Sequence, residues 1–177
     1  MNAEFDLFPP PRRTVHRTRN AATALGLVGG AAAAGSIAAS PDDAWYAGLA
    51  KPPWQPPREA FPLVWSSLYA TIAATTATVL NELDRRGDAD GAAEFRRALA
   101  RNLALNGAWT WLFFRQRNLA LSAIGAGLLA VNSICLTRRV ARVARRFGVA
   151  MAPYAAWTSF ATVLASAVWW RNRDHQA

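Results

Sequence analysis

The sequence has few of the side chains that support metal binding or acid–base catalysis. It contains one cysteine and two histidines, and His16 and His175 both stand near the ends of the chain. No metal-ligating cluster, Ser/His/Asp set, phosphate-binding loop or nucleotide-binding fingerprint can be recognised. We therefore expect no metal site and no required cofactor. Cys135 is the lone cysteine, so no disulfide can form within one chain.

Charged side chains are absent from four long segments, each 19 to 24 residues in length. These segments are residues 21–39, 60–81, 118–137 and 147–170. A fifth segment, 98–114, carries only Arg101 near its start, where a long side chain can reach the membrane interface. A helix of about 20 apolar residues, rising about 1.5 Å per residue, crosses the roughly 30 Å of hydrocarbon in a bilayer. The pattern therefore predicts membrane-spanning helices.

The predicted fold is an all-α membrane protein, a bundle of five transmembrane helices. Their expected bounds are about 21–39, 61–83, 92–114, 118–140 and 149–171. The mean hydropathy of +0.05 is low for a membrane protein, because the charges gather between the segments and much of the apolar content is alanine. A soluble alanine-rich bundle is the alternative, but its helices would show a charged face at every turn. Because the spans lack Asp and Glu, a proton-coupled carboxylate relay is not expected.

The basic residues, which give a net charge of +9, are unevenly distributed between the predicted spans. If the N-terminus is cytoplasmic, 14 of the 20 Lys and Arg residues flank the cytoplasmic side and 6 flank the other. The larger group contains Arg12, Arg13, Arg17, Arg19, Arg85, Arg86, Arg96, Arg97, Arg101, Arg138, Arg139, Arg142, Arg145 and Arg146. The positive-inside rule predicts such a bias. We expect a multi-pass protein of a bacterial cell membrane with a cytoplasmic N-terminus, an external C-terminus and no nucleic-acid partner.

The segments outside the predicted spans differ in character. Residues 1–20 form a basic, proline-rich tail that is expected to be disordered, and residues 173–177 form a short C-terminal tail. The longest connection, 40–60, carries five prolines and the aromatic residues Trp45, Tyr46 and Trp54. Its prolines stiffen the chain, and we interpret it as a lid over the helix ends. The alternative is a plain interfacial anchor, because Trp and Tyr favour the membrane surface.

The predicted helix 92–114 separates into a polar aromatic face and a small-residue face. At 100° per residue, one face carries Asn102, Asn106, Trp109 and Phe113. Amides that face lipid are costly, so they should face protein or a cavity; interhelical hydrogen bonding alone is an equal alternative to a pocket. The opposite face carries Ala100, Ala104 and Ala108. This stripe permits close approach of another helix, which we expect in a homodimer.

Two further predicted spans carry aromatic side chains at helical spacing. Trp65 lies four residues after Phe61 and four before Tyr69, and Trp157 lies four residues before Ala161. Such stripes more often pack in a core than bind a ligand. However, Trp65, Trp109 and Trp157 all lie inside predicted spans, where their indole N–H groups need hydrogen-bond partners. A pocket that holds a polar-edged aromatic ligand would supply them.

Three blocks of the sequence resemble the TspO/translocator protein family, also called tryptophan-rich sensory proteins. They are WYAGLAKPPWQPPREAFPLVWSSLY at 45–69, NGAWTWLFFRQRN at 106–118 and PYAAWTSFATVL at 153–164. The blocks follow the order and spacing of the family, and the first is highly specific. The resemblance extends over residues 21–172 as one transmembrane domain.

The resemblance implies a five-helix membrane protein, commonly dimeric, with a pocket that opens toward the first loop. Family members bind porphyrins and other haem-type tetrapyrroles. Matched by motif, the pocket residues are Tyr46, Trp65, Tyr69, Asn102, Trp109, Trp157 and Ala161. Trp65 and Trp157 match the tryptophans implicated in light-dependent porphyrin breakdown by some bacterial members, and would be the catalytic residues of that reaction. Leu164–Ser166 lacks the tyrosine of the proposed cholesterol motif, so cholesterol binding is doubtful.

Three functions are compatible with these features. The first is a tetrapyrrole-binding sensor or regulator, since a flat apolar macrocycle suits stacking on indoles. The second is a transporter of porphyrin-like compounds, which the lack of intramembrane charges and of internal repeats disfavours. The third is an enzyme that degrades protoporphyrin with light and tryptophan radicals, which needs no acid–base residues.

Overall fold

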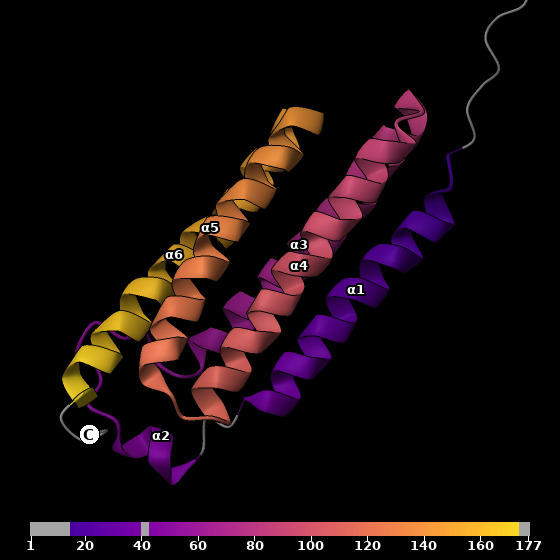
Figure 1. Cartoon of the computed structure of the whole chain (residues 1–177). Helices are drawn as coiled ribbons and strands as arrows, with labels where there is room; N and C mark the ends of the chain where they lie inside the picture. Colours follow the sequence, from indigo (N-terminus) through magenta and orange to yellow (C-terminus); the bar gives the residue numbers. More distant parts are fainter. Residues whose placement is uncertain (1–14, 40–42, 174–177) are drawn as a thin grey trace, which may run out of the picture.

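The computed structural model describes residues 15–39 and 43–173, and these form six α-helices and no strand (Figure 1). Five helices are long: α1 (Arg17–Ala38), α3 (Ala60–Arg86), α4 (Ala89–Phe114), α5 (Leu119–Val143) and α6 (Arg145–Asn172). The short helix α2 (Ala44–Gly48) lies between α1 and α3. The expectation of an all-helical protein is therefore confirmed for the described residues.

Four of the long helices, α1, α3, α5 and α6, are long and apolar enough to cross a membrane. Helix α4 has the length but falls outside this group. Its first half carries Arg96, Arg97 and Arg101, and its second half carries Asn102 and Asn106, which lower its mean hydropathy. The apolar content of α4 is thus too diluted for composition alone to define a span.

The long helices pack in a closed ring. Helix α1 contacts α3 and α4, α4 contacts α5, α5 contacts α6, and α6 returns to α3. The fully buried core includes Ile72, Leu80, Leu99, Leu136 and Tyr154. Helix α3 also contacts α4 and α5 across the ring. Val28 of α1 belongs to the same buried cluster, so side chains from all five long helices meet in the core.

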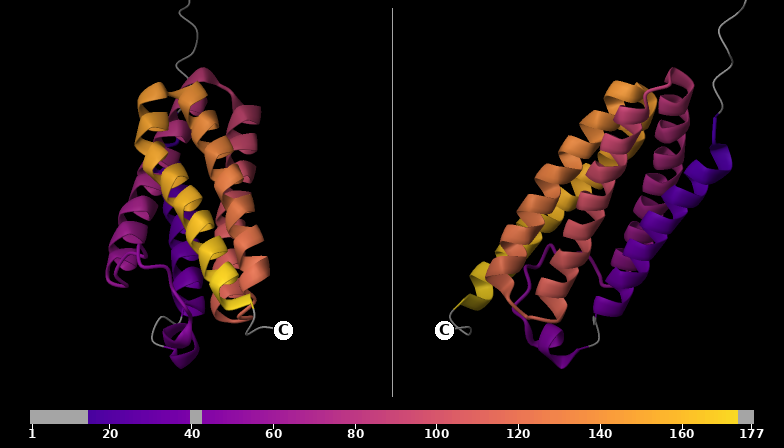
Figure 2. Two further views of the ribbon diagram at one scale, coloured as in Figure 1. Left: turned by 90° about the vertical axis from the view of Figure 1, so that its left-hand side faces the viewer. Right: turned by 45° about the vertical axis from the view of Figure 1, so that its right-hand side comes forward.

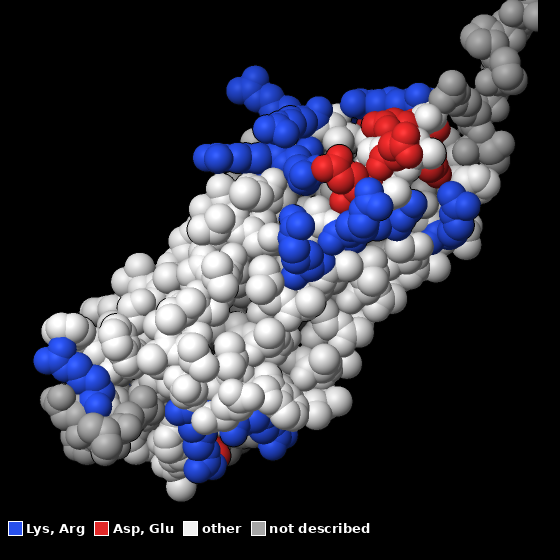
Figure 3. All heavy atoms as spheres, in the orientation of Figure 1, with Lys and Arg blue, Asp and Glu red and all other residues white. Residues whose placement is uncertain are grey.

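The outer surface of the ring is apolar and the charges lie at its two ends. Large hydrophobic side chains are exposed on the outside: Leu25, Ile37, Leu63, Ile124, Leu128, Val131 and Val163. Figure 3 shows blue and red side chains gathered at one end, a smaller blue group at the other, and an uncharged belt between them. A belt of this kind suits contact with lipid tails, where the backbone polar groups are satisfied within helices.

Local sequence explains where several helices start and stop. Helix α3 ends at Gly87, whose φ of 66° lies in the left-handed region that favours glycine. Helix α4 begins after Asp88, whose carboxylate accepts from the backbone N–H of Gly91 at 2.7 Å. Helix α5 begins after Asn118, whose side-chain oxygen accepts from the N–H of Leu121 at 2.9 Å. These caps set the tight α3–α4 turn and the start of α5.

Two helices begin four residues before their expected starts. Helix α1 begins at Arg17, so the last four residues of the segment expected to be a disordered tail, 17–20, are helical. The rest of that expected tail up to residue 14, and residues 174–177 of the expected C-terminal tail, lie outside the described residues. Helix α6 begins at Arg145, directly after extended Ala144. Pro153 therefore lies inside α6 rather than in its first turn, and it cannot donate to the carbonyl of Val149.

Candidate ligand-binding site

The segment that follows α1 is held over one end of the ring by charged and aromatic contacts. Asp43 caps α2 and accepts from the N–H of Trp45 at 2.9 Å. Arg117, in the turn after α4, donates to the other oxygen of Asp43 at 2.7 Å, and its guanidinium lies 5.5 Å from the ring centroid of Trp45. The N–H of Trp45 and the charge of Arg117 lower the pKa of Asp43. The carboxylate is thus kept ionised, and it fixes α2 to the α4–α5 turn.

A second attachment joins this segment to the C-terminal end of α6. The backbone N–H of Ala50 donates to Oδ1 of Asn172 at 2.9 Å, and Nδ2 of Asn172 donates back to the Ala50 carbonyl at 3.0 Å. Asn172 is buried, whereas Ala50 is exposed, so both bonds are partly buried. Figure 2 shows α2 and the chain after it crossing this end of the molecule beside the end of α6. The segment 43–60 therefore covers the end of the ring, as a lid would.

Tyr46 points from α2 onto the end of α4. Its ring centroid lies 6.0 Å from that of Phe113 and 5.7 Å from that of Phe114. Its hydroxyl accepts from Nε2 of Gln55 at 3.3 Å, and Nζ of Lys51 lies 4.5 Å from its ring centroid. Burial raises the pKa of Tyr46. Trp109 contacts the same Phe113, at 6.2 Å between centroids, so two of the expected pocket residues share one aromatic neighbour.

A second aromatic group lies between α3 and α6. The ring of Trp65 contacts Tyr69 at 5.5 Å and Tyr154 at 6.5 Å between centroids. One turn nearer the lid, Phe61 of α3 contacts Trp157 of α6 at 5.8 Å. Trp65 and Trp157 therefore lie on facing helices at adjacent levels. Both are partly buried against the main core.

A buried hydrogen-bond network joins α4, α5 and α6 next to this aromatic group. The hydroxyl of Tyr154 donates to Oδ1 of Asn102 at 2.7 Å. The amide Nδ2 of Asn102 lies 3.1 Å from both Oδ1 of Asn132 and Oγ of Ser133, to which it donates. Asn102 and Tyr154 are both 0% exposed. Both polar atoms of the Asn102 side chain thus have hydrogen-bond partners on other helices, and this bonding is sufficient to explain a buried asparagine at this position.

Three members of this network were not singled out in the sequence, although a signal for them was present. Asn132 and Ser133 are adjacent polar residues inside the uncharged segment 118–137, and Tyr154 lies three residues before Trp157. A polar side chain inside a membrane span needs a partner. The rule that each polar residue in a span should meet a polar residue of another span would have predicted that Asn132, Ser133 and Tyr154 lie in the site.

Asn106, one turn after Asn102, is only half satisfied. Its Oδ1 accepts from the hydroxyl of Tyr69 at 3.4 Å. Its Nδ2 is buried and has no hydrogen-bond partner among the described residues, and the same holds for Nε1 of Trp109 and Nε1 of Trp157. A buried donor without a partner costs about 1–3 kcal/mol. Natural proteins tolerate few such groups unless a ligand or an ordered water completes them.

The other expected residues have distinct surroundings. Ala161 is partly buried on α6, one turn after Trp157. The indole of Trp109 faces Gly125 of α5, where an added Cβ would lie 3.9 Å from its Cδ1, an ordinary van der Waals contact. The stripe of Ala100, Ala104 and Ala108 is exposed on the outside of α4. The structure therefore separates the alanine face from the tryptophans on the inner side of the ring.

The polar groups of the assembled site are of the kind that form hydrogen bonds. Its polar groups are amides, hydroxyls and indole N–H groups, and the described residues contain no group of His, Cys, Asp and Glu that could hold a metal. The unpartnered groups are all donors. A ligand with a flat apolar body and hydrogen-bond acceptors at its edge would match them.

Comparisons with known proteins agree with the sequence blocks and the helical fold. The profile of the TspO/MBR family matches residues 22–171. The chain is 33% identical to the translocator protein of Sus scrofa over 135 residues, which are 75% of each chain. It is 30% identical to the tryptophan-rich sensory protein of Cereibacter sphaeroides over 142 residues, which are 80% of this chain and 84% of the relative. It is 32% identical to the uncharacterized membrane protein YtaB of Bacillus subtilis over 123 residues, which are 70% of this chain and 77% of the relative. The resemblance noted in the sequence is thereby confirmed, and the chain belongs to the TspO/MBR family of membrane proteins.

Proposed function

We propose that the protein binds a porphyrin-like tetrapyrrole between its tryptophans, as a sensor or regulator in the membrane. The observation that carries the proposal is the set of three buried donors, on Asn106, Trp109 and Trp157, that have no hydrogen-bond partner among the residues the structure describes. They lie among aromatic side chains and below the lid segment 43–60. Donors with aromatic neighbours favour a planar ligand that accepts hydrogen bonds at its edge.

A tetrapyrrole has both a flat apolar macrocycle and polar carboxylates at its edge, and each part would match a part of the site. Its macrocycle would stack on the indoles of Trp65 and Trp157, and its carboxylates would accept hydrogen bonds or lie near Lys51 in the lid segment. Bound in this way it would also bury apolar area that water otherwise contacts. Tyr46 and Tyr69 would border the ligand, because each contacts a residue of the donor set or its aromatic neighbour.

The proposal is tested by titrating the purified full chain with protoporphyrin, haem and coproporphyrin while tryptophan fluorescence is recorded. A saturable quench with one ligand per chain is expected for at least one tetrapyrrole. The absence of saturable quenching across the whole panel would contradict the proposal.

A light-dependent reaction is a second candidate for the same site. Trp65 contacts Tyr69 and Tyr154, so its indole beside a bound porphyrin would have oxidisable neighbours, whereas Trp157 contacts only the phenylalanine rings of Phe61 and Phe160 among the described aromatic pairs. Illumination of the protoporphyrin complex in air separates the two functions. Loss of the Soret band that depends on the protein would support the enzyme, and a stable band would support the sensor.

The membrane topology that we propose has five spans, with α4 as the fifth, and a cytoplasmic N-terminus. Helix α4 packs between α1 and α5, which are apolar enough to span, so it would cross the same hydrocarbon. We expect cysteines placed at Asp88 and at Gln116, in a Cys135→Ser background, to react with a membrane-impermeant thiol reagent from opposite sides. Labelling of both positions from one side would show that α4 does not cross.

We also propose that the alanine face of α4 forms a homodimer contact. Ala104 is exposed on the outside of the ring, where a second helix could approach closely. Replacing Ala104 by leucine should lower the dimer fraction several-fold in detergent through steric exclusion, as measured by crosslinking or light scattering. Val131→Leu, on the exposed face of α5, is the matched control. An unchanged dimer fraction in Ala104→Leu would remove this face from the interface.

A further inference from the structure

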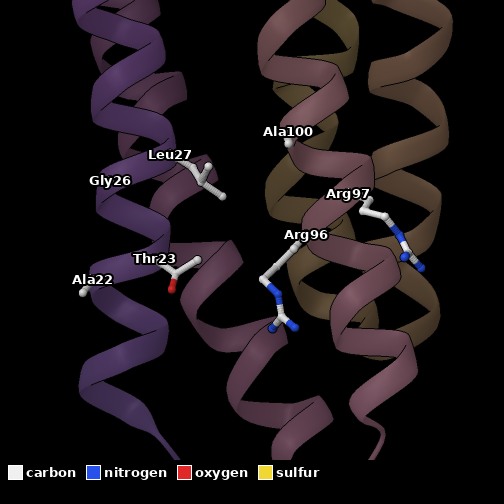
Figure 4. Close-up of a pocket in the computed structure, with 7 residues that line it drawn as sticks. All are labelled: Ala22, Thr23, Gly26, Leu27, Arg96, Arg97 and Ala100. Atoms are coloured by element: carbon white, nitrogen blue, oxygen red, sulfur yellow. The ribbon is translucent and has the colours of Figure 1, made fainter.

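An open groove runs along the outside of the ring between α1 and α4, near the end where most charges gather. It is lined by Ala22, Thr23, Gly26 and Leu27 of α1 and by Arg96, Arg97 and Ala100 of α4. Figure 4 shows these side chains on the two facing helices. The groove is separate from the tryptophan site, because its lining residues come from the outer faces of α1 and α4.

The floor of the groove is apolar and free of steric obstruction. A Cβ added at Gly26 would meet nothing within 4 Å, and Ala22 and Ala100 contribute only methyl groups. Beyond the charged end of the molecule the protein surface is an uncharged belt (Figure 3). A hydrocarbon chain is the natural occupant of such a surface inside a bilayer.

Arg96 places a positive charge in the same groove. It is partly buried, and Figure 4 shows its guanidinium between α1 and α4, near the level of Thr23 and away from Ala100. Within the described segments, neither Arg96 nor Arg97 forms an ion pair or a side-chain hydrogen bond. A partly desolvated guanidinium that lacks an anion is poised to bind one, and its planar fork suits the oxygens of a phosphate.

We propose that this groove is a binding site for one anionic phospholipid. The phosphate would lie against Arg96, and an acyl chain would follow the floor past Gly26 into the hydrocarbon, with Ala100 at the edge that the groove shares with the proposed dimer contact. Basic pockets between membrane helices commonly bind anionic head groups. The combination of one charged end and one apolar end selects an amphiphile, because a free phosphate would leave the apolar floor uncovered.

The proposal is tested by measuring lipid binding to the purified full chain in detergent by native mass spectrometry. The probes are dioleoyl phosphatidylglycerol, dioleoyl phosphatidylcholine and glycerol 3-phosphate. We expect one phosphatidylglycerol to bind more tightly than phosphatidylcholine, and glycerol 3-phosphate not to bind. Arg96→Gln should weaken phosphatidylglycerol binding by about 5- to 10-fold, the effect of one lost charge contact, and leave phosphatidylcholine binding unchanged.

Two matched controls make the result specific to the groove. Arg142→Gln removes the same charge from exposed α5 at the same end of the molecule and should have little effect. Gly26→Leu should fill the floor and weaken both lipids, whereas Gly30→Leu, also in open space on α1, should not. Melting temperatures of the variants identify any that fail to fold.

Three outcomes would overturn the proposal. Equal losses in Arg96→Gln and Arg142→Gln would mean that the charged end attracts lipid without a site. Unchanged lipid binding in Gly26→Leu would exclude the groove. Conversion of a dimer to a monomer by Gly26→Leu, with the phosphatidylglycerol preference intact, would assign the groove to a subunit interface instead.

Discussion

Alanine at Trp65 or at Trp157 should weaken protoporphyrin binding by about 5- to 150-fold. The estimate corresponds to about 1–3 kcal/mol for one aromatic stacking partner. Trp157 should lie at the upper part of this range, because its buried N–H has no partner in the described part of the chain and would also donate to the ligand. Fluorescence titration of each variant gives the affinity. Trp111→Ala and Trp170→Ala are the matched controls, because these side chains are 52% and 59% exposed.

The packing explanation of the same tryptophans makes a different prediction. If Trp157 only fills space beside Phe61 and Phe160, Trp157→Ala should lower the melting temperature and leave the affinity of the folded fraction unchanged. Phenylalanine at either position separates binding from photochemistry, since it preserves an aromatic face but is harder to oxidise. Unaltered affinity in both alanine variants would end the pocket assignment.

Replacing Asn102 by alanine should have the largest effect on stability, a loss of about 1–3 kcal/mol in the free energy of unfolding. The substitution leaves the hydroxyl of Tyr154 and the side chains of Asn132 and Ser133 without their common partner inside the ring. Titration with a denaturing detergent measures the change. Tyr154→Phe should cost less, about 1 kcal/mol, because it removes one donor and keeps the ring.

The double variant Asn102→Ala/Tyr154→Phe tests whether these groups act as one network. Contacting residues couple by about 0.5–3 kcal/mol, so its loss should be smaller than the sum of the two single losses. Gln116→Ala, in the exposed turn after α4, is the control and should change little. Wild-type stability in Asn102→Ala would show that interhelical hydrogen bonding does not hold these three helices together.

The sequence was sufficient to predict an all-α membrane protein of this family, because charge-free segments and the aromatic-proline block are local features. It was less informative for α4, whose arginines and asparagines dilute the apolar signal. Helix α2 was not predicted, because five residues give too short a pattern. Its start depends on the Asp43 cap, and its position depends on Arg117, far along the chain.

The candidate site shows the same division between local and distant information. The tryptophans were visible as buried aromatic residues in apolar runs, and helical periodicity placed Asn102 and Asn106 on one face. Periodicity could not show that the amide of Asn102 is used by Tyr154, Asn132 and Ser133 while that of Asn106 keeps a free donor. That difference depends on which residues of other helices reach each amide, and these lie 30 to 52 positions away from Asn102.

The most direct test of the tetrapyrrole site is the indole ¹⁵N–¹H spectrum of tryptophan-labelled protein, recorded with and without protoporphyrin. The proposed function predicts that the indole signals of Trp109 and Trp157 shift on binding, because their N–H groups are buried donors without a partner within residues 15–39 and 43–173. The signals of exposed Trp111 and Trp170 should stay in place. Shifts confined to the exposed tryptophans, with Trp109 and Trp157 unchanged at saturating protoporphyrin, would contradict the account.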